Sequence, residues 1–182
     1  MKCSNNRHEG HEEGKQGMTN EVTKNEQVTW MGSCMIPLEH VCHCSLDESI
    51  NKAISYIIDR RYSHIPVLDG NKKVVGIFSV STLMEIVRRN APDRNCGALE
   101  SIRCDLDIIN HSTEVFKFVS IRNTIAEVRA ICDDVKKEGK HIGMFLVTAE
   151  GGKDEPLYGI FTEWDFSKVL VYKAKEAAPK LV

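Results

Sequence analysis

The second half of this 182-residue chain repeats the pattern of the first half, and such a duplication restricts the folds that the chain can adopt. The segment 76–83 reads Gly-Ile-Phe-Ser-Val-Ser-Thr-Leu, and the segment 159–166 reads Gly-Ile-Phe-Thr-Glu-Trp-Asp-Phe. Farther upstream, the segment 45–50 resembles the segment 120–125. The offset between the copies is 75 residues upstream and 83 residues downstream, so the second copy carries eight more residues, which we assign to its connections.

Each copy has the sequence pattern of a strand, a helix, two strands and a second helix. In the first copy, the runs 65–68 and 74–78 flank Asp69-Gly70-Asn71 and predict a hairpin. The helices are predicted from apolar residues at helical spacing: Ile50, Ala53, Ile54, Ile57 and Ile58; Leu83, Ile86 and Val87; Ile125, Val128, Ile131 and Cys132; and Phe166, Val169 and Leu170. The remaining strands are predicted at 144–147 and 157–161.

We therefore predict an α/β (α+β) fold in which two β-α-β-β-α motifs pack as a pseudo-symmetric pair. A single unit of this size buries little core, whereas two copies packed sheet against sheet bury much more. The predicted parts are a flexible polar tail at 1–27, the first motif at 28–90, a linker at 91–113, the second motif at 114–176 and a C-terminal tail at 177–182.

Composition excludes several classes of protein. The chain has 24 Lys and Arg against 26 Asp and Glu, and this balance argues against binding nucleic acid by bulk charge. No apolar run approaches the roughly 20 residues that a membrane span needs, and residues 1–27 lack the apolar stretch of a secretory signal. The seven cysteines are odd in number and irregularly spaced, which favours thiols in a reducing cytoplasm.

Both copies place a hydroxyl residue where a strand passes into the last helix, Ser79 in the first and Thr162 in the second. The pattern Thr162-x-x-Asp165 is typical of a helix capping box. The same geometry suits a nucleotide, because free N–H groups at a helix start attract phosphate and a carboxylate can bind ribose hydroxyls. The motif alone leaves both interpretations open.

The duplication and these motifs together resemble a tandem pair of CBS domains over about residues 30–172. The segment 61–69, Arg-Tyr-Ser-His-Ile-Pro-Val-Leu-Asp, is similar to the family's Arg-x-Ser-x-x-Pro-Val-hydrophobic-Asp segment. The segment 34–37, Cys-Met-Ile-Pro, resembles the family's Met-x-Pro sequence before the first strand. The second copy departs from the pattern because Phe145 stands where a proline is usual.

The resemblance implies that an adenosine-containing ligand binds in the cleft between the copies. Thr162 would contact phosphate, Asp165 would bind the ribose, and Ile160 would line the base pocket. The opposite copy would complete this primary site with Pro37, Cys42, Arg61, Tyr62 and Ser63, of which Arg61 would lie near the phosphates.

The mirror site is expected to be degenerate. Ser79 keeps the hydroxyl and Ile77 the apolar wall, but Thr82 replaces the ribose-binding Asp and lacks two anionic acceptors. Its other wall would include Ser112, Lys140, His141 and Ile142, with Lys140 near the phosphates. We expect weaker binding or none at this second site.

Histidines and cysteines suggest further roles that the sequence leaves open. His64 and His141 flank the predicted cleft and suit either packing or ligand contact, and a histidine beside phosphate would make affinity depend on pH. In a strand, His40, Cys42 and Cys44 share one face, but the outer two lie too far apart for one ion.

The sequence thus predicts a regulatory, non-catalytic module that senses AMP, ADP, ATP or S-adenosylmethionine and contains no catalytic or metal-ligating residues. We expect a homodimer that acts through a protein partner, without nucleic acid or membrane contact. The alternatives are a ligand-free assembly module and a metal- or redox-responsive protein that uses Cys42, Cys44 and the tail with its Cys3, His8 and His11. A small enzyme is disfavoured because no acid/base pair or activated nucleophile emerges from the sequence.

Overall fold

The first copy follows the predicted order of elements in the computed structural model, which describes residues 29–89, 97–106 and 114–169. Helix α2 begins after Ser49, whose hydroxyl accepts the Lys52 N–H at 3.3 Å, and it ends at Arg61 in the left-handed conformation with φ of 58°. The elements are β2 (Cys44–Ser45), α2 (Ile50–Arg60), β3 (His64–Leu68), β4 (Val74–Ser79) and α3 (Val80–Arg89). The predicted helices and hairpin are therefore confirmed.

The second copy has the same order, and its first helix is held by a capping box. The Thr124 hydroxyl accepts the Glu127 N–H, and the Glu127 carboxylate accepts the Thr124 N–H, so two otherwise unpaired donors are satisfied. The elements are β5 (Glu114–Ser120), α4 (Ile125–Lys137), β6 (His141–Thr148), β7 (Gly159–Phe161) and a helix over 163–169.

A short segment of the first copy completes the sheet of the second. Strand β1 (Ile36–Pro37), between the 3-10 turns η1 (Met31–Ser33) and η2 (Leu38–His40), pairs antiparallel with β7, so this sheet has the order β1-β7-β6-β5. Gly159 is required at the contact, because a Cβ there would lie 2.3 Å from the Ile36 carbonyl oxygen.

The reciprocal exchange occurs on the other sheet, which has the order β2-β3-β4. The 3-10 segment η3 (Leu99–Asp105) returns to the first copy, and the Leu106 carbonyl accepts the Ile77 N–H at 2.8 Å. A Cβ on Gly76 would lie 2.2 Å from the Leu106 carbonyl oxygen. The part of the predicted linker that the structure describes, 97–106, thus packs into the core of the first motif.

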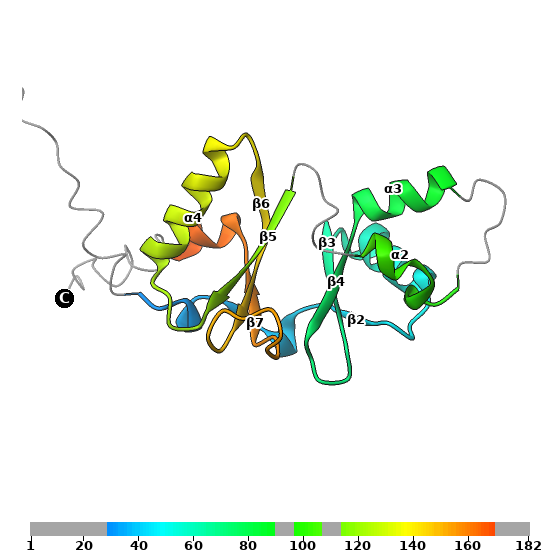
Figure 1. The fold of residues 1–182 in the computed structure, drawn as a ribbon, viewed down its shortest axis with the longest axis horizontal. Coiled ribbons are helices and arrows are strands. Elements are labelled where there is room, and N and C mark those ends of the chain that lie inside the picture. The colour runs from blue at the N-terminus through cyan, green and yellow to red at the C-terminus, as the bar shows by residue number, and fades with distance from the viewer. Residues whose placement is uncertain (1–28, 90–96, 107–113, 170–182) are drawn as a thin grey trace, which may run out of the picture.

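The two copies pack through their sheets, with helices on the outer sides (Figure 1). One apolar cluster lies inside each copy, and a third joins the facing sheets of both. The buried members of the third cluster are Leu68, Val74, Ile77, Phe116, Met144, Leu146 and Leu157. The prediction of a pseudo-symmetric pair packed sheet against sheet is confirmed.

Two features of the first copy differ from the sequence predictions: the exposure of two helix residues and the extent of one strand. Ile58 and Val87, which were assigned to buried helix faces, are 64% and 57% exposed, because the helical stripe is wider than the surface that covers it. The strand considered over 40–44 is limited to Cys44–Ser45, because a 3-10 turn occupies Leu38–His40.

In the part of the chain that the structure describes, no helix has the length and apolar character needed to cross a membrane.

Candidate functional site

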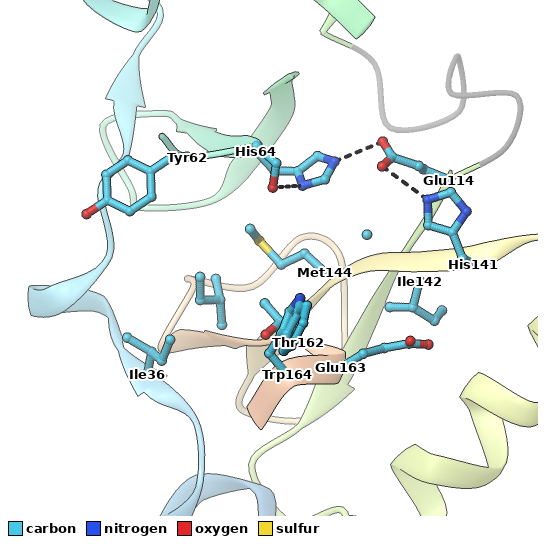
Figure 2. A pocket seen from close by; sticks show the side chains of 13 residues that line it. Ile36, Tyr62, His64, Glu114, His141, Ile142, Met144, Thr162, Glu163 and Trp164 are labelled. Carbon is cyan, nitrogen blue, oxygen red and sulfur yellow. Dashed lines mark hydrogen bonds and ion pairs between the residues drawn. The ribbon is translucent and has the colours of Figure 1, made fainter. Parts of the chain in front are cut away.

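A cavity of about 400 Å³ opens between the two copies, where β3, β6 and β7 approach each other. This volume falls within the range of small-molecule sites. Its walls come from both halves of the chain (Figure 2): Ile36, Tyr62, Ser63, His64, Glu114, His141, Ile142, Gly143, Met144, Ile160, Thr162, Glu163 and Trp164. A ligand here would contact both motifs at once.

The polar wall of the cavity is a carboxylate held between two imidazoles (Figure 2). His64 Nε2 lies 2.8 Å from one oxygen of Glu114, and His141 Nε2 lies 3.2 Å from the other. His64 belongs to the first copy, whereas Glu114 and His141 belong to the second, so this cluster bridges the two motifs. Burial opposes ionisation of Glu114, but the hydrogen bonds and charges of the two histidines outweigh it and lower the pKa of Glu114.

His64 is positioned by its neighbours on several sides. Its Nδ1 lies 2.9 Å from the Ser63 hydroxyl, and its ring meets Phe116 edge to face at a centroid distance of 5.4 Å. Gly143 permits this arrangement, because a Cβ there would lie 2.8 Å from the Phe116 ring and 3.5 Å from His64 Nε2. Any larger residue at position 143 would therefore displace the wall of the cavity.

Thr162 and Asp165 cap the helix over 163–169. The Thr162 N–H and hydroxyl both donate to Asp165 Oδ2, at 2.9 and 2.7 Å, and exposed Lys168 donates to Oδ1 at 2.6 Å. Asp165 is 3% exposed and does not line the cavity, whereas Thr162 does. Half of the predicted capping box is present, because the Asp165 carboxylate accepts the Thr162 N–H but the Thr162 hydroxyl donates to Asp165. A ligand contact through Asp165 stays a prediction.

The remaining residues predicted for the primary site lie at different distances from the cavity. Ile160, Tyr62 and Ser63 line it together with Thr162. Pro37 pairs with Gly159 in the sheet, next to the lining residue Ile36. Cys42 and Arg61 are not among the lining residues: the charges acting on Cys42 are those of Glu48, Lys52 and Arg60, and Arg61 forms the left-handed turn that leads into Tyr62.

The pair at the predicted second site forms a reciprocal cap at the start of α3. The Ser79 N–H donates to Thr82 Oγ1 and the Thr82 N–H donates to Ser79 Oγ, both at 3.2 Å, and both residues are buried. Ile77 is also fully buried.

The residues predicted for the other wall of this second site lie in different places in the structure. His141 and Ile142 line the Thr162 cavity instead, because they begin β6, which pairs with the strand that precedes Thr162. Lys140 is exposed and pairs with Glu138 at 3.5 Å. Ser112 lies outside the described residues.

Cys44 and Cys132 have the properties of buried thiols. Burial, the hydrogen bond to Glu48 and nearby negative charge raise the pKa of Cys44 to about 12, and burial raises the pKa of Cys132 to about 11. Both side chains are at most 2% exposed, so neither is poised as a reactive thiolate. Within the described ranges, no group of three or more His, Cys, Asp or Glu residues is arranged to hold a metal ion. The tail residues considered as ligands lie outside these ranges.

Several lining residues were not predicted from the sequence. Glu114 is the first residue of β5 and belongs to no motif, and Gly143 and Met144 lie inside an ordinary apolar run. The available signal was symmetry: His64 and His141 begin corresponding strands of the two copies, and their meeting point follows once the sheets are known to face each other.

Comparisons with known proteins agree with this geometry. A family model for the CBS domain matches residues 34–89. The structure of CbpB in complex with c-di-AMP has a TM-score of 0.58 at 15% identity, covering 85% of this chain and 92% of that chain. The structure of CBSX2 in complex with AMP has a TM-score of 0.58 at 15% identity, covering 80% and 98%.

A third structure, the putative acetoin utilization protein AcuB from Vibrio cholerae, has a TM-score of 0.55 at 21% identity, covering 82% of this chain and 98% of that chain. No curated protein matches the chain in sequence. The family match lies in the first copy, and the structural likeness extends over both copies. Residues 34–89 therefore match the CBS domain, and over most of its length the chain has the fold of solved CBS-domain proteins.

Proposed function

We propose that this chain is a regulatory, non-catalytic module that binds an adenosine-containing ligand in the cavity between its two motifs. The observation that carries the proposal is the cavity itself, which is lined by Tyr62, Ser63 and His64 from one motif and by Thr162 and its neighbours from the other. Two proteins of the same fold are described in complex with c-di-AMP and with AMP. Their likeness supports the adenosine-containing class of ligand, which includes AMP, ADP, ATP and S-adenosylmethionine.

In this proposal the apolar part of the lining, Ile36, Ile160 and Met144, packs against the base, and Tyr62 covers it. Thr162 provides a hydroxyl for the phosphate or sugar. Asp165 positions Thr162 through Oδ2. Its other oxygen, Oδ1, can bind the ribose only after exposed Lys168 stops donating to it. Ribose binding therefore competes with an ion pair between an exposed ammonium and a buried carboxylate.

Ligand binding would change how the two motifs pack. The cavity lies between them, so a ligand that fits one relative orientation better shifts the population toward that orientation. The regulatory output then passes to a partner protein or to a second copy of the chain in the cytoplasm.

A homodimer is supported by apolar residues on the outer helices. Val80, Met84 and Val87 lie at helical spacing on α3 and are 45%, 63% and 57% exposed, and Ile58 on α2 is 64% exposed. Exposed apolar residues that gather on one helix face are typical of interaction sites.

Ser63, His64 and Glu114 form a hydrogen-bonded row that contains the residue types of a catalytic triad. In a serine hydrolase triad the nucleophile contacts Nε2 and the carboxylate contacts Nδ1. Here the two nitrogens are exchanged, and the second oxygen of Glu114 is occupied by His141. This row is better suited to holding a charge than to activating a nucleophile.

The proposal is tested by thermal denaturation of the full chain with AMP, ADP, ATP, S-adenosylmethionine, NAD and zinc. A ligand that binds only the folded state stabilises it by RT ln(1 + [L]/Kd), about 2.7 kcal/mol at one hundred times the Kd. An adenosine-containing ligand is expected to raise the midpoint. The absence of any such shift would contradict the proposal and favour a ligand-free assembly module, and stabilisation by zinc alone would favour the metal-responsive alternative.

A further inference from the structure

The lining of the cavity carries little positive charge for a site that would hold a phosphate. Among the described lining residues there is no Lys or Arg, whereas there are two carboxylates, Glu114 and Glu163. Lys136 lies 3.3 Å from the Glu163 carboxylate and is paired with it. His64 and His141 are thus the described lining residues that can become cationic.

The hydrogen bonds around His64 define its neutral form. An ionised carboxylate only accepts hydrogen bonds, so the proton of the neutral imidazole must lie on Nε2, which faces Glu114. Nδ1 is then an acceptor, and the Ser63 hydroxyl at 2.9 Å must donate to it. In this state the hydroxyl hydrogen of Ser63 points at the imidazole and is not offered to a ligand.

Protonation of His64 would reverse this bond without leaving any group unpaired. The new Nδ1–H donates to the Ser63 oxygen, because a hydroxyl can accept as well as donate. The hydroxyl hydrogen is then released toward the cavity that Ser63 lines. Uptake of one proton thereby adds a positive charge to the wall and converts Ser63 into a donor for an anion.

His141 adds a second such group on the opposite motif. Its Nε2 faces Glu114, and its side chain is 54% exposed, so a protonated ring can donate through Nδ1. The titratable groups that face the two imidazoles from the surrounding elements are Glu114 on β5, Glu163 on the helix over 163–169 and Tyr62 before β3. The lowered pKa of Glu114 keeps a negative charge between the rings at neutral pH.

We propose that the cavity binds phosphate-bearing ligands together with protons taken up by His64 and His141, so that affinity for the phosphate group increases as the pH falls. This inference rests on the proposed function, since it concerns the same cavity. It predicts that a nucleoside without phosphate binds with little dependence on pH.

The test is calorimetry of the full chain with adenosine and with adenosine 5′-(methyl phosphate), whose phosphodiester keeps one charge between pH 6 and 8. Coupling to one proton changes affinity by up to tenfold per pH unit, so proton uptake by one histidine makes the methyl phosphate bind about 10- to 100-fold more tightly at pH 6 than at pH 8, and uptake by both makes the ratio larger. Titrations at pH 7 in two buffers of different ionisation enthalpy should show net proton uptake with the phosphate ester.

The variants His64→Gln and His141→Gln should each reduce the pH dependence and the proton uptake. Ser63→Ala removes the hydroxyl that contacts His64 Nδ1, and it should weaken the methyl phosphate at pH 6 by a larger factor than it weakens adenosine. His40→Gln is the matched control, because His40 is an exposed histidine outside the cavity and should behave like the wild type.

The two proposals fail in different ways. If adenosine binds but the methyl phosphate shows the same pH profile as adenosine, the proton coupling is overturned and the proposed function stands. If the pH dependence is as large in each of the two histidine variants as in the wild type, the coupling is also overturned. If neither ligand binds at any pH, the proposed function fails and the coupling fails with it.

Discussion

Replacement of Asp165 by alanine separates the structural role of this residue from its proposed role in binding. Its buried carboxylate accepts the Thr162 N–H at 2.9 Å, the Thr162 hydroxyl at 2.7 Å and the Lys168 ammonium at 2.6 Å. Loss of a helix cap costs about 0.5–2 kcal/mol, and a hydrogen bond to a charged group contributes about 1.5–3 kcal/mol. Because the exposed Lys168 pair adds little, we expect Asp165→Ala to lower the free energy of unfolding by about 2–3 kcal/mol.

For a chain of this length, about 1 kcal/mol corresponds to about 2–4 °C, so the midpoint should fall by about 4–12 °C. The pseudo-symmetric cap supplies the matched control, because Thr82→Ala removes a neutral acceptor at the equivalent position and should cost about 1 kcal/mol. Urea denaturation measures both losses, and calorimetry with adenosine measures binding.

We expect Asp165→Ala to weaken adenosine at least about tenfold, the loss of one hydrogen bond to a charged group, whereas Thr82→Ala leaves the affinity of the Thr162 cavity unchanged. Equal losses of stability in the two variants would refute the assignment of three bonds to a buried carboxylate. Unchanged adenosine affinity in Asp165→Ala would refute its contact with the ribose.

Three further variants test other parts of the account. Gly159→Ala should separate β1 from β7 and cost about 2–3 kcal/mol in urea denaturation, because its Cβ would lie 2.3 Å from a backbone oxygen. The control Gly70→Ala, whose Cβ meets nothing within 4 Å, should cost less than about 0.5 kcal/mol. Similar costs in the two variants would contradict the close approach of β1 and β7. Because the pKa of Glu114 is lowered, the stability that its ionised form contributes is present above the ordinary carboxyl range and is lost as the pH falls through the folded-state value. The midpoint of the wild type should therefore fall more steeply below about pH 4.3 than that of Glu114→Gln, and parallel curves would contradict this reasoning. Met84→Lys should convert a dimer into a monomer in size-exclusion chromatography with light scattering, and a wild type that is already monomeric would contradict the expected homodimer.

Local structure was predictable where a periodic pattern and a turn or cap signal coincide. The first helix of each copy follows from its apolar spacing, and the β3–β4 hairpin follows from the polar turn between two apolar runs. The duplication then made the pseudo-symmetric pair predictable. The helix and hairpin signals are local in the chain, whereas the duplication relates segments that lie 75 to 83 residues apart.

The exchange of segments between the copies was not predictable, because a strand as short as Ile36–Pro37 has no periodicity. Gly76 and Gly159 are the residues that permit the exchange, but in sequence each looks like an ordinary strand glycine. The allocation of His141 to the Thr162 cavity follows from the pairing of β6 with β7, and pairing of strands is a property of the tertiary fold.

The candidate site was predicted in part for the same reason. Its motif residues Thr162 and Ser63 belong to recognisable segments, and both line the cavity. Glu114 has no motif, since its importance comes from two histidines that lie 50 and 27 residues away along the chain. Electrostatic clusters of this type become visible only when the two sheets are placed face to face.

The central claim is that one cavity, built by both motifs, receives an adenosine-containing ligand. Backbone amide chemical shifts of the isotope-labelled full chain, recorded during titration with AMP and with S-adenosylmethionine, test it most directly. The account predicts that a ligand shifts the amides of Ser63 and His64 together with those of Met144 and Thr162, while Gly70 in the distant hairpin turn is unaffected. Saturating ligand that shifts only one motif, or that leaves all four lining amides unchanged, would contradict it.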